Sequence, residues 1–137
     1  MVLAGLLVLW LLATLTGAVR YIPNDRIGVV EKLWSGSGSV QLGLLALHGE
    51  AGFQPELRRG GFHFFTPLQY RVHICPMVSV TQGKLGYVFA RDGIDLPAGQ
   101  TLADNATIHN FLDVRAFLEG GGQKGPQRKI LREGTHI

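Results

Sequence analysis

The sequence contains a single cysteine, Cys75, so an internal disulfide bond cannot form. This absence argues against a small secreted scaffold stabilised by disulfides. The chain also lacks a run of Lys and Arg residues, although its formal net charge is +3 over 137 residues. Nucleic-acid-binding domains usually concentrate basic residues in such runs or patches. We therefore predict no nucleic-acid partner.

No charged side chain occurs between Met1 and Val19, and the first charged residue is Arg20. At about 1.5 Å per residue, a helix of this stretch would be roughly 28 Å long, close to the hydrocarbon thickness of a bilayer. The sequence therefore predicts a transmembrane anchor at residues 1–19. Thr14 and Thr16 are expected to return their hydroxyl groups to the helix backbone. The side chains expected to face lipid are Leu3, Leu6, Leu7, Leu9, Trp10, Leu11, Leu12 and Leu15.

Two other interpretations of residues 1–19 remain open. A cleaved signal peptide usually begins with a basic region and has a shorter apolar core, but Thr16 and Ala18 are small residues of the kind that precede a cleavage site. A buried helix of a soluble domain would normally show one polar face, which this stretch lacks. For an anchor, the basic residues Arg20, Arg26 and Lys32 favour a single-pass membrane protein with a cytoplasmic domain.

About 118 residues follow the predicted anchor, enough for one small domain with its own core. Pro23, Asn24 and Asp25 predict a break in the chain, so residues 20–25 are expected to form a linker. Five later segments have the β-branched, aromatic or alternating composition of strands. They are residues 26–34, 40–48, 70–74, 77–80 and 84–90.

Paired glycines at positions 60 and 61 permit a tight bend before a group of aromatic residues. These residues would either enter the core or dip into a membrane interface, where aromatic side chains are favoured. Both interpretations stay open. The residues concerned are Phe62, Phe64, Phe65 and Pro67.

The last third of the sequence shows helical patterns. Asn110 is the predicted N-cap of a first helix, which has Asp113 in its first turn and ends at three consecutive glycines, residues 120–122. Its apolar residues Phe111, Val114, Phe117 and Leu118 are expected to share one face.

A second helix is predicted from Pro126 to Glu133, with Gly134 at its C-terminal cap. Ile130 and Leu131 would then face the core. The chain stops at Ile137, where a new strand begins, which predicts that the domain over residues 26–137 is incomplete.

The sequence shows no catalytic or metal-ligating arrangement. Its five histidines are scattered, and although His73 and Cys75 lie two apart on one face of a predicted strand, a zinc site needs three or four ligands. The glycine-rich segments lack the Gly-Lys-Ser/Thr ending of a phosphate-binding loop. We therefore predict no catalytic residues, no cofactor and no metal, and a small anchored or secreted enzyme remains only an alternative.

Three blocks behind the apolar N-terminus resemble the SPFH or band 7 family, the group of stomatin, prohibitin, flotillin and the bacterial protease regulators. Residues 59–64, Arg-Gly-Gly-Phe-His-Phe, are similar to the Pro-Gly-Leu-His-Phe signature of the family, with Gly60 in the place of the proline. Residues 82–93 and 127–134 resemble stretches of bacterial flotillin-like members. The resemblance covers most of the chain after the predicted anchor.

The resemblance implies an α+β fold: a transmembrane helix, then a mixed SPFH/band 7 domain with several short strands and two C-terminal helices. Family members assemble into large rings or cages that organise membrane patches, and many regulate membrane proteases. We therefore expect a lipid bilayer partner and a homo-oligomeric full-length protein, acting as a membrane scaffold or as the regulator of a membrane protease. The family's ring contacts come largely from a long C-terminal coiled coil, and no heptad pattern occurs in this sequence. No catalytic residues carry over, because the family has no general catalytic site.

Overall fold

The computed structural model describes residues 1–104 and 111–136. In this part of the chain, short strands outnumber helices, and the mixture fits an α+β class. The elements in chain order are α1 (Val2–Leu15), β1 (Val19–Ile22), β2 (Arg26–Lys32), β3 (Gly52–Phe53), β4 (Gly61–Phe64), β5 (Tyr70–Pro76), β6 (Val78–Val80), β7 (Phe89–Ala90), α2 (Val114–Glu119), β8 (Gly125–Pro126) and β9 (Gly134–His136).

The prediction of an N-terminal transmembrane helix is wrong. Helix α1 has 14 residues, so at about 1.5 Å per residue it is roughly 21 Å long, against a hydrocarbon core of roughly 30 Å. Residues 16–18 leave the helix, with Gly17 in a left-handed conformation at φ +76°, and the chain continues into β1. Within residues 1–104 and 111–136, no helix combines the length and the apolar character needed to cross a bilayer.

The prediction of two C-terminal helices is also wrong. The first of them is present as α2, but its N-cap is Asp113, and the predicted cap Asn110 lies outside the described residues. The segment predicted as the second helix is not helical: Pro126 belongs to β8, and Leu131 forms a bridge to Gly86. Ile130, which was expected to be buried there, is 43% exposed. Tertiary pairing with residues 86–90 therefore outweighs the helical pattern of this segment.

The central sheet has the strand order β3–β2–β5, with both pairs antiparallel. The strand predicted from Arg26 is confirmed as β2, and the strand predicted from Tyr70 is confirmed as β5, which extends to Pro76. The strand predicted at residues 40–48 is wrong, because that segment contains only an isolated bridge at Leu45. Gly43, at φ +82°, interrupts it with a conformation that disfavours a continuous strand.

The small core lies where β2 meets β1 and the loop before β3. Ile22 is fully buried, and Ile27 and Val30 of β2 are buried as well. Gly28 is needed at this contact, because a Cβ there would lie 2.5 Å from Ile22 Cδ1 and 3.0 Å from Val72 Cγ1. β1 is therefore held against the central sheet by close packing.

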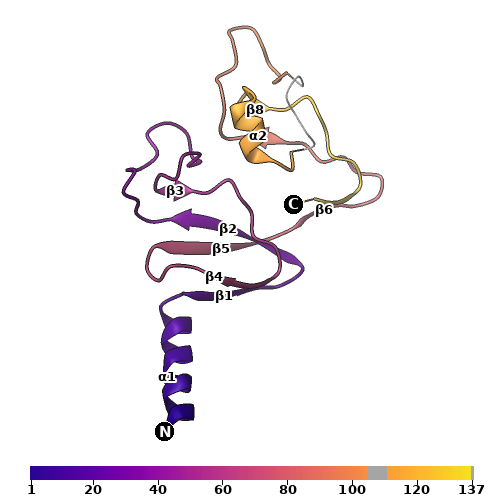
Figure 1. The fold of residues 1–137 in the computed structure, drawn as a ribbon. Helices are drawn as coiled ribbons and strands as arrows, with labels where there is room; N and C mark the ends of the chain where they lie inside the picture. Colours follow the sequence, from indigo (N-terminus) through magenta and orange to yellow (C-terminus); the bar gives the residue numbers. More distant parts are fainter. Residues whose placement is uncertain (105–110, 137) are drawn as a thin grey trace.

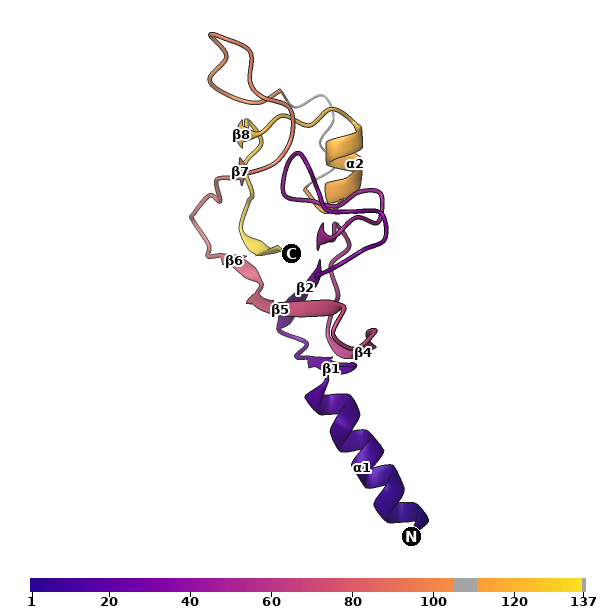
Figure 2. The same cartoon turned by 90° about the vertical axis from the view of Figure 1, so that its left-hand side faces the viewer.

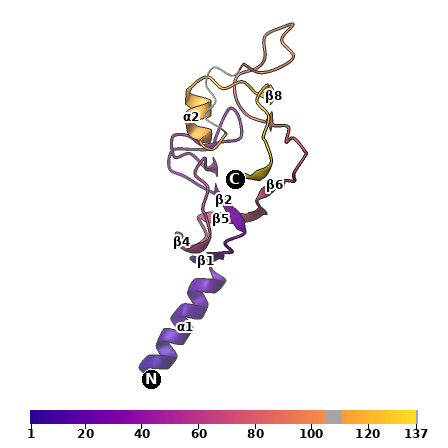
Figure 3. The same ribbon diagram turned by 90° about the vertical axis from the view of Figure 1, so that its right-hand side faces the viewer.

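A two-stranded ribbon connects α1 to the rest of the molecule. β1 pairs antiparallel with β4, from Val19 opposite Phe64 to Ile22 opposite Gly61. The amide of Phe65 extends this pairing by donating to the carbonyl of Ala18 over 2.8 Å. Part of the segment predicted as a linker is therefore strand β1. The ribbon supports α1 at its base, and α1 projects from one end of the molecule (Figures 1–3).

Helix α2 lies at the opposite end of the molecule from α1 (Figure 1). Its N-cap carboxylate, Asp113 Oδ1, accepts a hydrogen bond from the amide of Ala116 over 2.9 Å. Two further ribbons, β6–β9 and β7–β8, join the last part of the chain to residues 78–90. The long sequence separation of these pairs explains why local patterns did not predict them.

Candidate membrane-interaction surface

Helix α1 exposes apolar side chains on every side. None of its residues is buried, and it lacks a polar face. Leu3 is 78% exposed and Leu15 is 74% exposed, at opposite ends of the helix, and Trp10 is 54% exposed between them. The other predicted lipid-facing leucines are exposed as well. A helix that is apolar all round requires an apolar environment all round, which water does not supply.

The polar side chains of α1 and of its C-terminus are satisfied within the helix. The Thr14 hydroxyl donates to the carbonyl of Leu11 over 2.8 Å, and the Thr16 hydroxyl donates to the carbonyl of Leu12 over 2.8 Å. This confirms the expected return of both hydroxyls to the backbone. Neither threonine therefore carries an unpaired donor into an apolar environment.

The β1–β4 ribbon continues the apolar surface of α1. Side chains alternate between the two faces of a strand, and directly opposed residues share a face. The register therefore groups Val19 with Phe64 and Tyr21 with Phe62 on one face. The rings of Tyr21 and Phe62 lie 5.0 Å apart, centre to centre, and both side chains are exposed. We call α1 together with this face (Val19, Tyr21, Phe62 and Phe64) the apolar tip.

Phe64 joins the two parts of the apolar tip. It is 77% exposed, yet it lines an apolar groove of about 560 Å³ with Trp10, Ala13 and Ala18 of the α1 segment. The helix and the ribbon therefore present one continuous surface. For Phe62 and Phe64, the interpretation as core residues is wrong, since Phe62 is 64% exposed.

The other two residues predicted near an interface behave differently. Phe65 is half-buried, and its ring lies 5.9 Å from that of Tyr70. Pro67 is exposed, and Leu68 beside it is 74% exposed. Leu68 also adopts a left-handed conformation at φ +62°, which is uncommon for this residue type. The loop after β4 thus adds an exposed leucine that the sequence patterns did not indicate.

Arg20 is the charged residue closest in sequence to the apolar tip. Its guanidinium group lies over the C-terminal end of α1, since a Cβ on Gly17 would be 3.1 Å from Arg20 Nη2. A cation at this position complements the partial negative charge of the helix C-terminus. Arg20 pairs with His63 across the ribbon, so both lie on the face opposite Tyr21 and Phe62.

Sequence reasoning missed Tyr21 because it assigned residues 20–25 to a linker. The signal that could have found it is the segment Val-Arg-Tyr-Ile at residues 19–22, whose β-branched and aromatic composition is typical of a strand. Pairing with the Gly-Phe-His-Phe segment would then have aligned Tyr21 with Phe62. That pairing spans about forty residues, so no local pattern specifies it.

The histidines do not come together into a metal site in the part of the chain that the structure describes. His73 Nε2 lies 2.8 Å from Glu31 Oε2 across β2 and β5, where the pair forms a surface contact with Arg71 nearby. His63 Nε2 makes one hydrogen bond with the carbonyl of Arg59, at 2.7 Å. Among residues 1–104 and 111–136, no three side chains of His, Cys, Asp or Glu gather as a metal site would need.

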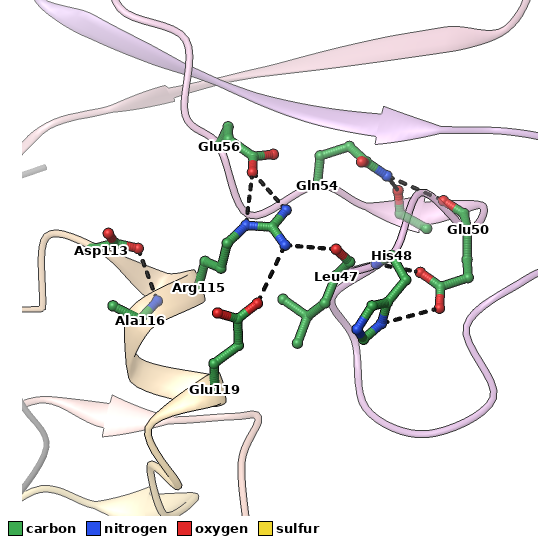
Figure 4. Close-up of polar contacts among 10 residues, drawn as sticks. Leu47, His48, Glu50, Gln54, Glu56, Asp113, Arg115, Ala116 and Glu119 are labelled. Carbon is green, nitrogen blue, oxygen red and sulfur yellow. Dashed lines mark hydrogen bonds and ion pairs between the residues drawn. The ribbon is translucent and has the colours of Figure 1, made fainter.

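A second polar cluster fastens α2 to the loops around β3 (Figure 4). Arg115 donates from Nη2 to Glu56 Oε1 over 2.7 Å and from Nη1 to the carbonyl of Leu47 over 2.6 Å. It also forms an ion pair with Glu119 one helical turn later. The hydrogen bond to Glu56 is the main reason that the pKa of Arg115 is raised. The cluster therefore joins α2 to the loops on either side of β3.

Comparison with known proteins adds no relative: no family model, curated protein or solved structure matches this chain. The resemblance of residues 59–64, 82–93 and 127–134 to SPFH proteins therefore stays a prediction from the sequence.

Proposed function

We propose that the chain is a membrane-surface scaffold whose apolar tip embeds in a lipid bilayer without crossing it. The observation that carries this proposal is the exposure of every side of α1 in a segment without charged side chains. Transfer of such a surface from water into hydrocarbon is favourable, because apolar area is removed from water.

The ribbon supports the same placement. Aromatic side chains are favoured at the boundary between hydrocarbon and headgroups, and Tyr21, Phe62 and Phe64 lie at the base of α1. Arg20 belongs to the same ribbon and would lie at the level of the lipid phosphates. The apolar helix is thus followed by a ribbon that carries both the aromatic side chains and a basic residue, in the order in which a membrane changes from hydrocarbon to water.

The scaffold part of the proposal rests on the sequence resemblance to SPFH proteins. Members of that family assemble on membranes, so we propose that copies of the full-length protein associate there. A membrane protease remains a candidate partner for the same reason.

Vesicle flotation of the full 137-residue chain tests the membrane part of the proposal. We expect the unmodified chain to float with vesicles and Leu9→Arg to float poorly. On an insertion scale, replacing a central leucine by arginine costs about 3 kcal/mol, more than a hundredfold in affinity. Leu42→Arg is the matched control, because Leu42 is 90% exposed in the loop between β2 and β3, and it should float normally.

Equal flotation of the Leu9→Arg and Leu42→Arg variants would show that α1 does not contact the membrane. Recovery of a soluble chain shortened near Ala18 would instead identify residues 1–18 as a cleaved signal. Assembly is tested separately by counting photobleaching steps of the full-length protein on a supported bilayer. Single bleaching steps at all protein densities would mean that the protein binds membranes as a monomer, and they would overturn the proposal that it is a scaffold.

A further inference from the structure

A cavity of about 320 Å³ lies between α2 and the central sheet. Val29 and Phe53 line it from the sheet, and Leu45 lines it from the loop before β3. Val114, Phe117 and Leu118 line it from α2, on the shared face that the sequence predicts. Its volume falls at the lower end of the range for small-molecule sites, roughly 300–1,000 Å³.

The walls of this cavity are almost entirely apolar. An ordered water molecule needs two to four polar partners, which such walls do not supply. The aromatic and aliphatic side chains would instead favour an apolar ligand, since they remove its surface from water. A single aliphatic chain suits the volume better than the two chains of a phospholipid.

Three charged residues also line the cavity, and two of them are already engaged. The Asp92 carboxylate accepts hydrogen bonds from the amides of Leu44, Leu45 and Gly93 over 2.8, 3.1 and 2.9 Å. Asp113 caps α2 through the amide of Ala116, as described above.

Arg91 is the third charged residue of the lining, and it is exposed. An arginine is charged at any pH at which the protein folds, and its planar guanidinium group matches a carboxylate in a bidentate contact. The site thus combines an apolar interior with a cationic side chain on its rim.

We propose that this cavity binds a free fatty acid, with the aliphatic chain between α2 and the sheet and the carboxylate paired with Arg91. This cavity is a different surface from the apolar tip, because α1 and α2 lie at opposite ends of the molecule (Figure 1). Affinity is expected to rise about fourfold with each methylene until the cavity is full.

Photolabelling of the full chain in lipid nanodiscs tests this proposal. The probe is decanoate with a diazirine at the end distal to the carboxylate, and labelled peptides are identified by mass spectrometry. We expect labels on residues 114–118 that free decanoate suppresses. Decyltrimethylammonium, which has the same chain length but opposite charge, should be at least tenfold less effective as a competitor. Labels on α1 serve as an internal control for general partitioning into lipid.

Two pairs of variants locate the site. Val114→Trp and Leu45→Trp each fill the cavity from a different wall, and both should abolish labelling of residues 114–118 while labelling of α1 persists. Arg91→Glu should weaken decanoate competition at least tenfold. Arg128→Glu is its matched control, because Arg128 is exposed and does not line the cavity, and it should change nothing.

Persistent labelling of residues 114–118 in folded cavity-filled variants, judged by circular dichroism, would overturn the proposal. Labels restricted to α1 would do the same, as would stronger labelling of the cavity by a photoreactive phospholipid. Equal competition by the anionic and cationic amphiphiles, or equal behaviour of the Arg91→Glu and Arg128→Glu variants, would overturn the role of Arg91. If both tryptophan variants unfold, the proposal is decided by whether free decanoate suppresses labelling of residues 114–118 in the unmodified chain more strongly than decyltrimethylammonium does.

Discussion

Phe64 illustrates how one side chain connects two elements without being buried by either. It projects from β4, opposite Val19 of β1, and shares a groove with Trp10 and Ala13 of α1. Such an exposed aromatic residue contributes little to folding, because water still reaches most of its surface. The apolar surface of Phe64 therefore remains available for contact with lipid.

Replacing Phe64 by serine should therefore weaken membrane binding and leave stability unchanged. Burial of a phenylalanine is worth roughly 1.5–3 kcal/mol, and partial burial at an interface would give about 1–2 kcal/mol, or about tenfold in vesicle affinity. Phe89→Ser is the control, since Phe89 is 62% exposed on β7, outside the apolar tip. Equal vesicle affinities of the two variants in sedimentation assays would contradict the role of the ribbon.

Gly60 shows a different constraint at the residue scale. A Cβ at this position would lie 2.7 Å from the backbone Cα of Asn24. No larger residue fits unless the turn after β1 moves.

Gly60→Ala is expected to destabilise the protein by about 1–3 kcal/mol, the usual cost of overpacking against backbone. Gly36→Ala is the matched control, because a Cβ at Gly36 would meet nothing within 4 Å and its φ is not in the left-handed region. Urea unfolding of the two variants measures the difference. A loss of stability at Gly36 as large as that at Gly60 would refute the steric explanation.

At the scale of elements, α2 depends on its cap and on its docking contacts more than on its length. A helix of six residues is too short to be stable by itself. Asp113 supplies the N-cap, and Arg115 fastens the helix to Glu56 and Leu47 (Figure 4). These contacts hold Phe117 and Leu118 against the cavity.

Asp113→Ala should lower the free energy of unfolding by about 1 kcal/mol, because the amide of Ala116 loses its acceptor. Asp113→Asn should be nearly neutral, since asparagine caps helices about as well as aspartate. Hydrogen exchange at residues 114–119 should accelerate only in the alanine variant. Similar exchange in both variants would mean that the side-chain cap does not stabilise α2.

At the scale of the whole molecule, the structure is elongated, with α1 at one end and α2 at the other (Figures 1–3). The β1–β4 ribbon lies next to α1, and the central sheet follows it (Figure 1). If the apolar tip enters a membrane, this order of elements becomes an order of depth, which two tryptophans report at different levels.

Trp10 lies within α1, whereas Trp34 follows the end of β2 in the body of the molecule. In vesicles with brominated acyl chains, the fluorescence of a Trp34→Phe variant, which retains Trp10, should be quenched and shifted to the blue. A Trp10→Phe variant, which retains Trp34, should be unaffected. Quenching of Trp34 as strong as that of Trp10 would contradict the proposed orientation of the molecule.

The sequence by itself determined the features that depend on local composition. The apolar segment, the strands starting at Arg26 and Tyr70, and the shared face of Val114, Phe117 and Leu118 follow from side-chain periodicity and from missing charges. The two threonine hydrogen bonds follow as well, because their partners lie three and four residues away.

Only the tertiary structure decided where α1 ends, which strands pair, and which faces remain exposed. The apolar composition continues to Val19, but pairing of Val19 with Phe64 draws that residue into β1 and shortens the helix. The predicted second helix is likewise replaced by β pairing. Residues 89–90 pair with residues 125–126, and residue 86 pairs with residue 131. These outcomes depend on contacts between residues about forty positions apart, whose free energies no local pattern of side chains contains.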